Sequence, residues 1–293
     1  MGRIEILPQQ GACGAEIRCG SVQEVDDETF RAIRRAWLEH LVVVFRDQRM
    51  TDSEFTAFGR RFGPLKLASI GPSVEGGAAD EGPEVHVVSN VTENGLPIGI
   101  LGSGDVAWHT DMVSFLVPPT ATLLHALEVP STGGDTLFMN MYLAYETLPD
   151  DVKRGLPGLT IQHEVASHSS GAGTGASHPI VCTHPETGCN ALVLGSRQNT
   201  SVDGLSREAS DELLSALWTH AVQWRFIWRH RWRPGDVVAW DNRCTAHARQ
   251  AFDAGSRRVL HRIQVQGSVP PRTAPDALHR PAHPRVGPVP GVS

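Results

Sequence analysis

Three residues with metal-binding side chains are spaced as the ligands of one ion could be. His109 and Asp111 are two residues apart, in Trp-His-Thr-Asp. Residues i and i+2 of a β-strand project to the same side, so on a strand this imidazole and carboxylate could reach one ion together. His247, after the strand-like stretch 237–242, can supply a third ligand. Two imidazoles and one carboxylate on one face of an octahedron suit Fe(II), so we predict an iron site that leaves other positions open.

The other histidines fit a metal site less well. His163 and His168 enclose a sequence similar to a zinc-protease helix, but they are five residues apart. Two histidines must be four apart to share one helical face. The remaining candidates have no partner at ligand spacing, and we interpret them as ordinary polar or core residues: His178, His184, His220 and His230.

Further motifs surround the predicted ligands in a recognisable order. Gly133-Gly-Asp-Thr136 follows the first pair, Trp240-Asp-Asn-Arg243 precedes His247, and Arg258 and Arg262 come after it. The N-terminal half adds Gly14-Ala-Glu-Ile17, Val44-Phe45-Arg46 and Arg60-Arg-Phe-Gly-Pro64. In order and spacing, residues 11–267 resemble the taurine dioxygenase/2,4-D dioxygenase (TauD/TfdA) family.

This resemblance implies an Fe(II)- and 2-oxoglutarate-dependent dioxygenase that also uses O2. It implies a double-stranded β-helix core of the jelly-roll type, with the metal in its mouth and helices outside. It further implies that Thr136 and Arg258 hold the distal carboxylate of 2-oxoglutarate. A buried carboxylate needs a charged partner, and the forked guanidinium of arginine can meet it with two bonds.

The reaction implied is oxidation of an unactivated C–H, by hydroxylation or by further oxidation or desaturation, with release of succinate and CO2. Arg262 matches an arginine that meets the substrate's anion in relatives that act on sulfonates or carboxylic acids. Asp105 stands where taurine-specific relatives carry a polar amide, so we expect it to contact a substrate other than taurine. The apolar segments 98–101 and 113–116 favour a larger hydrocarbon body. An aryloxy acid or a terpenoid-like carboxylic acid fits best, the latter in secondary metabolite biosynthesis.

Two other function classes stay open at this point. A non-catalytic β-barrel protein that binds small molecules could keep the fold, although it would not need the complete ligand triad. A redox-neutral metal enzyme could keep the triad without the co-substrate residues. Labelled 2-oxoglutarate separates the three classes, because only the oxygenase releases CO2 from it in an Fe(II)- and O2-dependent way.

The elements that must position these residues are visible in the hydrophobic pattern. Residues 27–39 place Phe30 and Ile33 on one helical face, and further helices are predicted at 52–61 and 206–223. Short β-rich stretches lie at 41–45, 84–89, 122–127, 159–164, 191–194, 226–228, 237–240 and 259–265. Many short strands separated by turn residues favour a mainly β, closed or double-sheet fold with flanking helices.

The length and composition fit one domain with a tail. The 293 residues suffice for a core of ordinary size. We expect residues 1–267 to form a single dioxygenase domain and residues 268–293, which are rich in proline, to be irregular. Segments 68–84 and 169–177, rich in small residues, predict loops, which are either lids over an active site or plain surface insertions.

Charge, apolar runs and cysteines set the expected partners and location. The net charge of −6 disfavours a nucleic-acid partner. The longest apolar run, 41–45, is far too short to cross a bilayer, and the N-terminus lacks a signal-peptide pattern. We therefore expect a cytoplasmic protein, a homo-oligomer, that acts on a small organic acid and not on a membrane. Five cysteines without a CxxC pair predict free thiols.

Overall fold

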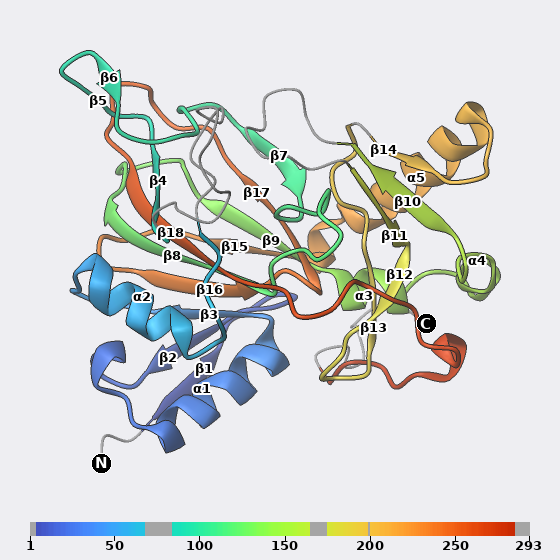
Figure 1. Cartoon of the computed structure of the whole chain (residues 1–293), viewed down its shortest axis with the longest axis horizontal. Coiled ribbons are helices and arrows are strands. Elements are labelled where there is room, and N and C mark those ends of the chain that lie inside the picture. The colour runs from blue at the N-terminus through green and yellow to red at the C-terminus, as the bar shows by residue number, and fades with distance from the viewer. Residues whose placement is uncertain (1–3, 68–83, 165–174, 199, 285–293) are drawn as a thin grey trace, which may run out of the picture.

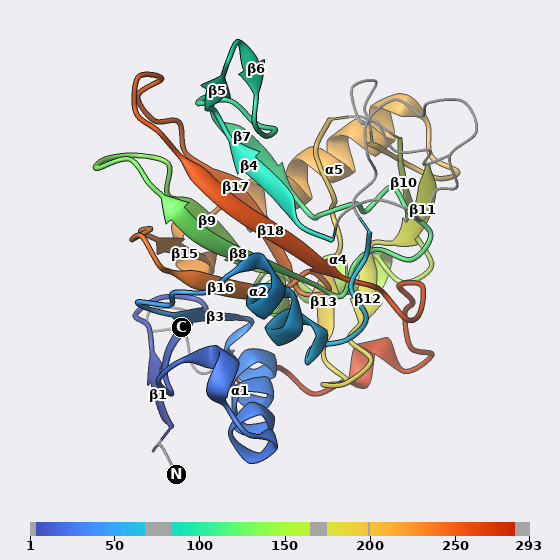
Figure 2. The same ribbon diagram turned by 60° about the vertical axis from the view of Figure 1, so that its left-hand side comes forward.

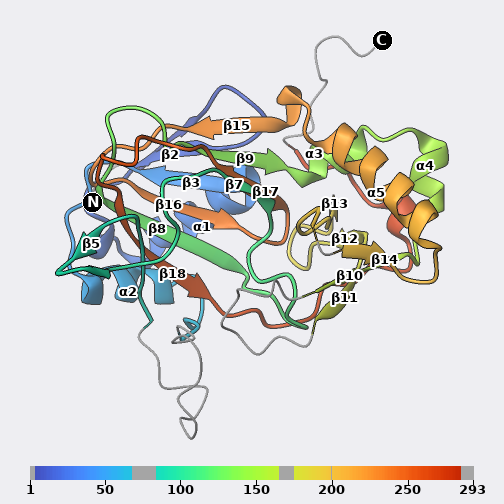
Figure 3. The same cartoon turned by 90° about the horizontal axis from the view of Figure 1, so that it is seen from above.

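Two β-sheets packed face to face form the body of the protein, as seen in the computed structural model (Figure 1). The structure describes residues 4–67, 84–164, 175–198 and 200–284. The larger sheet has seven strands in the order β1 (Glu5–Pro8), β2 (Ala15–Arg18), β3 (Val42–Phe45), β16 (Val237–Asp241), β8 (Ala121–Glu128), β18 (Val259–Val265) and β4 (His86–Ser89). The smaller sheet has the order β15 (Ile227–His230), β9 (Thr136–Asn140), β17 (Thr245–Arg249) and β7 (Val106–His109). Figure 3 shows the two layers from above.

Two amphipathic helices cover the outer face of the larger sheet, as Figure 2 shows. Helix α1 (Asp27–His40) begins where the Asp26 side chain accepts a hydrogen bond from the backbone N–H of Thr29 at 2.7 Å. Helix α2 (Asp52–Arg60) begins with a capping box, in which Thr51 and Glu54 satisfy each other's backbone N–H groups. The predicted helices at 27–39 and 52–61 are therefore confirmed to within one residue.

Aromatic side chains form the core between these helices and the sheet. Phe30 and Trp37 of α1 pack against Phe62, with ring centroids 5.1 and 5.4 Å apart and the rings edge to face. Phe45 of β3 and Phe58 of α2 meet in the same way at 5.4 Å. Edge-to-face pairs add to the burial of the rings themselves, so this layer fixes the helices on the sheet.

A smaller part with its own short strands and helices lies at one end of the two sheets (Figure 3). Its strands are β10 (Thr160–His163), β11 (Ala176–Pro179), β12 (Val181–Thr183), β13 (Asn190–Leu192) and β14 (Thr200–Val202), and its helices are α3 (Met141–Glu146), α4 (Asp150–Gly155) and α5 (Arg207–Ala221). A two-stranded ribbon, β5 (Thr92–Glu93) and β6 (Leu96–Pro97), and the short 3-10 helices η1 (Val22–Glu24), η2 (Trp224–Phe226) and η3 (Ala277–His279) complete the elements. Helix α5 confirms the prediction at 206–223, with Ser206 as its N-cap. Among the residues described, no helix has the length and apolar character that crossing a membrane requires.

The fold bears on three of the interpretations made from the sequence. His163 lies on strand β10, which agrees with the rejection of a zinc-protease helix for its segment. Residues 176 and 177, expected in a loop, belong to strand β11, whereas the rest of that predicted loop up to 174 lies outside the described residues. The predicted loop 68–84 also lies outside them, except for Glu84.

The segment after residue 267 packs on the body as far as the structure describes it. The backbone N–H of Thr183 donates to the carbonyl oxygen of Arg272 at 2.9 Å. His283 Nε2 lies 3.0 Å from the carbonyl oxygen of Leu38 on α1, and Ala277 in η3 is buried. Among its described residues this segment holds one short 3-10 helix, η3, and no β-strand.

Candidate metal and co-substrate site

The two predicted histidine ligands are cross-strand partners. His109 on β7 and His247 on β17 are paired in register, and their ring centroids lie 4.2 Å apart. Cross-strand neighbours on one face point the same way, and here both project into the space between the sheets. The Nε2 atoms lie 3.7 Å (His109) and 3.9 Å (His247) from Oδ1 of Asp111. Bonds of about 2 Å to one ion place adjacent ligand atoms roughly 3 Å apart, so the three groups could close around a metal with small movements.

Asp111 reaches this position through a turn and not through the strand alternation that we predicted. Strand β7 ends at His109, and Asp111 lies in the turn beyond it. The next residue, Met112, has a φ of 49°, a left-handed conformation that bends the chain sharply. The expectation of two ligands on one strand is therefore wrong, although the ligands do converge.

Hydrogen bonds orient the ligand atoms toward one point. His109 Nδ1 donates to the carbonyl oxygen of Ala107 at 2.8 Å, which directs Nε2 at Asp111. Asp111 Oδ2 accepts a hydrogen bond from the Thr122 hydroxyl at 2.6 Å, and this leaves Oδ1 to face both imidazoles. His247 Nδ1 is buried and has no hydrogen-bond partner within the described ranges.

The charges of the three groups suit a divalent cation. Burial, followed by the nearby His109, lowers the pKa of His247 to about 3, so its imidazole is neutral near pH 7, as a metal ligand must be. Burial alone would raise the pKa of Asp111, but the two histidines hold it well below its ordinary value. For His109 burial is outweighed by the contact with Asp111, and its pKa is raised. A proton therefore competes with the metal at this nitrogen.

A supporting network behind Asp111 was not foreseen. The Thr122 hydroxyl that donates to Asp111 accepts a hydrogen bond from Asn242 Nδ2 at 2.9 Å. Trp240 Nε1 donates to Asn242 Oδ1 at 2.8 Å and fixes the amide's orientation. Trp240 and Asn242 belong to a motif that the sequence shows, but Thr122 belongs to none. The network sets the direction of the carboxylate and limits its movement.

We expect Thr122→Val to weaken metal binding while the fold is kept. Valine has the shape of threonine but cannot donate to Asp111, and loss of such a supporting contact typically costs about 10- to 100-fold in metal affinity. Calorimetric titration with Mn(II) measures the loss of metal affinity. Thr120→Val is the matched control, because the Thr120 hydroxyl donates to the Gln266 carbonyl oxygen at 3.2 Å and not to Asp111. Equal affinities for both variants would contradict the role of Thr122.

A cavity of about 50 Å³ adjoins the three ligands, between the two sheets. Thr136 and Arg258, expected to hold a carboxylate, are both in its wall. Arg258 immediately precedes β18 and is only 2% exposed, and no acidic side chain within the described ranges forms an ion pair with it. The Thr136 hydroxyl accepts a hydrogen bond from Trp232 Nε1 at 3.0 Å and keeps its own proton to donate. A buried guanidinium without a counter-ion is costly, so this end of the cavity suits an anionic ligand.

The glycine motif before Thr136 makes room for this arginine. Gly134 has a φ of +68°, and a Cβ built on it would lie 3.3 Å from Arg258 Nε. Any other residue would therefore combine a strained backbone with a close contact to the guanidinium. Burial, and then the charge of Arg249, lowers the pKa of Arg258 to about 9, which still leaves it charged near pH 7.

The two residues expected at the substrate lie in different places. Arg262, on β18, is in the cavity wall, and its charge lowers the pKa of His247. Asp105 is not in that wall: its Oδ1 accepts a hydrogen bond from the backbone N–H of Ala251 at 2.7 Å. The geometry thus gives Asp105 a role in holding the chain together and lends no support to a contact with substrate. A further cavity residue, Arg249, was not foreseen.

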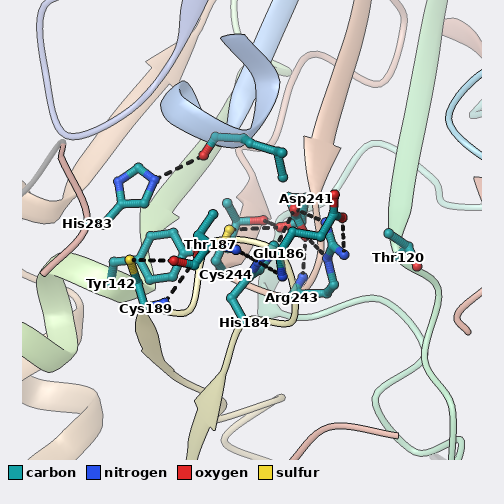
Figure 4. A network of polar contacts seen from close by, with 12 residues as sticks. Thr120, Tyr142, His184, Glu186, Thr187, Cys189, Asp241, Arg243, Cys244 and His283 are labelled. Atoms are coloured by element: carbon teal, nitrogen blue, oxygen red, sulfur yellow. Dashed lines mark hydrogen bonds and ion pairs between the residues drawn. The ribbon is translucent and has the colours of Figure 1, made fainter. Parts of the chain in front are cut away.

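A second group of possible metal ligands lies where β16 ends: His184, Asp241 and Cys244. Figure 4 shows them in a network of polar contacts. His184 Nδ1 accepts two backbone N–H groups at 3.2 and 3.1 Å, so its Nε2 carries the proton and donates to Asp241 at 3.1 Å. Arg243 donates to both oxygens of Asp241, at 2.8 and 2.6 Å, and burial raises the pKa of the Cys244 thiol well above its ordinary value. The groups satisfy one another, so we interpret the network as an anchor for the turn that leads to His247.

Comparison with known proteins places this chain in a family. Residues 5–264 match the model of the taurine catabolism dioxygenase TauD, TfdA family. Pentalenolactone F synthase of Streptomyces arenae is 32% identical over 286 residues, which cover 89% of this chain and 94% of that protein. The 2,4-dichlorophenoxyacetate dioxygenase of Cupriavidus pinatubonensis, described as alpha-ketoglutarate-dependent, is 34% identical over 251 residues, covering 79% and 86%.

The solved structures agree with the sequence comparison. The crystal structure of a taurine dioxygenase from Burkholderia xenovorans superposes with a TM-score of 0.79 at 32% identity and covers 94% of each chain. The predicted fold class, a mainly β double-stranded β-helix with flanking helices, is thereby confirmed. The chain belongs to the TauD/TfdA family, and it is an Fe(II)- and 2-oxoglutarate-dependent dioxygenase.

Proposed function

We propose that His109, Asp111 and His247 hold the iron and that Thr136 and Arg258 hold the distal carboxylate of 2-oxoglutarate. We further propose that the enzyme oxidises an unactivated C–H of a small, apolar substrate that carries a carboxylate, and releases succinate and CO2. Iron and 2-oxoglutarate, when bound, supply the oxidising power for O2-dependent attack on the C–H. The protein's own residues bind the co-substrate and the substrate, orient them and exclude water.

One observation supports an acidic substrate more than any other: Arg262 stands in the cavity wall, and no carboxylate among the described residues forms an ion pair with it. Its Nε is buried and has no hydrogen-bond partner in the part of the chain that the structure describes. Asp236 and Asp241, the acids that could have paired with it, are held by other cations: Arg46 binds Asp236, and Asp241 lies in the network of Figure 4. A half-buried cation beside a metal site needs an anion, and a substrate carboxylate supplies one.

Arg258, just before β18, and Arg262, on β18, are placed to bind two different anions. Arg258 and Arg262 are four residues apart, which is about 13 Å along an extended strand. One ligand carboxylate cannot bridge that span, so Arg258 takes the co-substrate and Arg262 the substrate. Val88 and Leu124, which are also in the wall, offer apolar contact to the substrate's hydrocarbon body.

The relatives' names favour the same class. One relative is named for 2,4-dichlorophenoxyacetate, an aryloxy acid, and another for the synthesis of pentalenolactone F. We therefore propose an aryloxy acid or a terpenoid-like carboxylic acid as substrate, the latter in secondary metabolite biosynthesis, with hydroxylation as the first product-forming step. Release of labelled CO2 from C1-labelled 2-oxoglutarate, measured with a panel of such acids and with their methyl esters, tests this. If no acid stimulates Fe(II)- and O2-dependent release, the proposal is wrong.

Arg262→Ala should impair use of the acid far more than use of 2-oxoglutarate. The variant should still form the weak charge-transfer band of the anaerobic complex with Fe(II) and 2-oxoglutarate. With the acid it should consume 2-oxoglutarate slowly without making product, because the C–H is no longer positioned. Its preference should move toward methyl esters, which carry no charge for the arginine to meet. A variant that melts much earlier yet distinguishes acid from ester as the parent does would indicate a structural role for Arg262.

A further inference from the structure

Arg249 is a second buried arginine in the wall of the co-substrate cavity. It lies on β17 two residues after His247, and therefore on the same face of the strand. Its exposed fraction is 8%, and no acidic side chain among the described residues forms an ion pair with it. None of the roles assigned above uses it.

The guanidinium of Arg249 fastens the segment that leads into β7. It donates to the carbonyl oxygens of Leu101 at 3.4 Å, Gly102 at 2.7 Å and Gly104, the last a very short contact. The residues just after β17 hold the same segment at two more points: the N–H of Phe252 donates to the carbonyl oxygen of Ser103, and the N–H of Ala251 donates to Oδ1 of Asp105. The segment runs directly into the strand that carries His109, so its position is tied to that of the metal site.

This segment forms part of the cavity itself. Leu101 is in the wall, and its φ of 70° is a left-handed conformation that is unfavourable for leucine. Such a conformation persists only where neighbouring groups hold it, and the bond from Arg249 to the Leu101 carbonyl oxygen is such a constraint. Arg249 therefore sets the shape of this side of the cavity.

Arg249 and Arg258 also place two like charges beside one small space. Both guanidinium carbons lie near the ring of Phe252, at 5.5 and 5.9 Å from its centroid. The acids whose charges act on them are already engaged: Asp135, near Arg258, is bound by Arg229 at 2.6 Å, and Asp105, near Arg249, accepts the N–H of Ala251. Two buried cations repel each other, and an anion between them relieves the repulsion. Three of the five N–H groups of Arg249 are used by the carbonyl oxygens, which leaves Nε–H and one more for a ligand.

We propose that Arg249 is a second positioning residue of the co-substrate site: it holds segment 101–105 as one wall of the cavity and adds its charge to that of Arg258 in binding the distal carboxylate. The inference rests on the proposed function, because it takes 2-oxoglutarate as the ligand of this cavity. It predicts that the affinity of the site depends on both the charge and the length of the co-substrate.

Two substitutions separate the effect of the Arg249 charge from its effect on the position of the cavity wall. Arg249→Gln removes the charge and keeps a short amide donor, whereas Arg249→Lys keeps the charge but cannot span three carbonyl oxygens. The dissociation constant of 2-oxoglutarate is measured from the charge-transfer band of the anaerobic Fe(II) complex. For Arg249→Gln it should rise by about tenfold, as expected from losing a bond between charged groups. Both variants should also discriminate less against 2-oxoadipate, which is one methylene longer, because the wall is no longer held.

Arg257→Gln is the matched control. Arg257 neighbours Arg258 but is exposed and bound to Glu128 at 2.6 Å, so this variant should bind both oxo acids as the parent does. Melting temperatures without ligand show whether each variant folds. If Arg249→Gln does not fold, Arg249→Lys decides. A folded Arg249 variant with the parent's affinity and the parent's discrimination against 2-oxoadipate would overturn the inference.

The same measurement on Arg258→Ala separates this inference from the proposed function. Weak binding in Arg258→Ala together with parent-like binding in the Arg249 variants would reject the inference alone. Parent-like binding in Arg258→Ala would reject the co-substrate assignment, and the inference with it.

Discussion

Replacing His109, Asp111 or His247 by alanine should abolish turnover and strongly weaken Fe(II) binding. Each change leaves two ligands, too few to hold the ion while open positions remain for the reactants. The fold should survive, because the three side chains face the space between the sheets and not the aromatic layer beneath α1 and α2. Calorimetric titration with Mn(II), circular dichroism melting and 2-oxoglutarate consumption together separate loss of the site from loss of the fold.

His220→Ala is a suitable control for these variants. His220 is a partly buried histidine on α5, and its Nε2 lies 2.9 Å from the carbonyl oxygen of Ala144, away from the metal site. Its replacement should leave metal binding unchanged even if it lowers the melting temperature. Full activity in any one of the three ligand variants would contradict the ligand assignment.

Arg258→Ala should raise the KM for 2-oxoglutarate by about two orders of magnitude or more. The variant leaves a buried carboxylate without its partner, which costs roughly 3–5 kcal/mol in comparable buried pairs. Each 1.4 kcal/mol corresponds to about a tenfold change in affinity. Arg258→Lys should recover only part of the loss, since an ammonium group cannot form the forked pair. The KM for 2-oxoglutarate at saturating substrate, and its dissociation constant in the anaerobic complex, provide the measurement.

The neighbouring Arg257 is not placed to take over the role of Arg258. Arg257 is bound to Glu128 and is half exposed on the outer side, so it cannot replace Arg258 in the cavity. An unchanged KM in Arg258→Ala would therefore contradict the assignment of Arg258 to the distal carboxylate. Arg257→Ala should behave as the parent in either case.

The sequence determined the elements whose signal is local. Helices α1 and α2 carry apolar residues at helical spacing between capping residues, and a helix is formed by contacts three or four residues apart. His109 and Asp111 could also be recognised as candidate metal ligands, because few residue types bind metals and these two are near each other in the chain. Matching motifs then supplied His247, Thr136 and Arg258, and the structure brings them all to one cavity.

The short strands of the smaller sheet were the weakest part of the prediction. Every residue of strands β9 and β17 is buried or half-buried, so these strands lack the alternation that marks a strand with one exposed face. Their pairing also joins residues more than a hundred positions apart: Phe138 lies opposite His247. Such register depends on how the whole sheet packs, and no local pattern records it.

Tertiary structure alone decided which polar residues surround the ligands. Thr122 and Asp105 look alike as isolated polar residues in the sequence. In the fold, a strand of the opposite sheet brings Thr122 to Asp111, while a backbone N–H captures Asp105 outside the cavity. Arg249 is a similar case, because a carbonyl oxygen to which it donates belongs to a segment almost 150 residues earlier in the chain. Residue type limits what chemistry a side chain can perform, but a hydrogen bond acts over about 3 Å, so its partner is chosen only when the sheets close on each other.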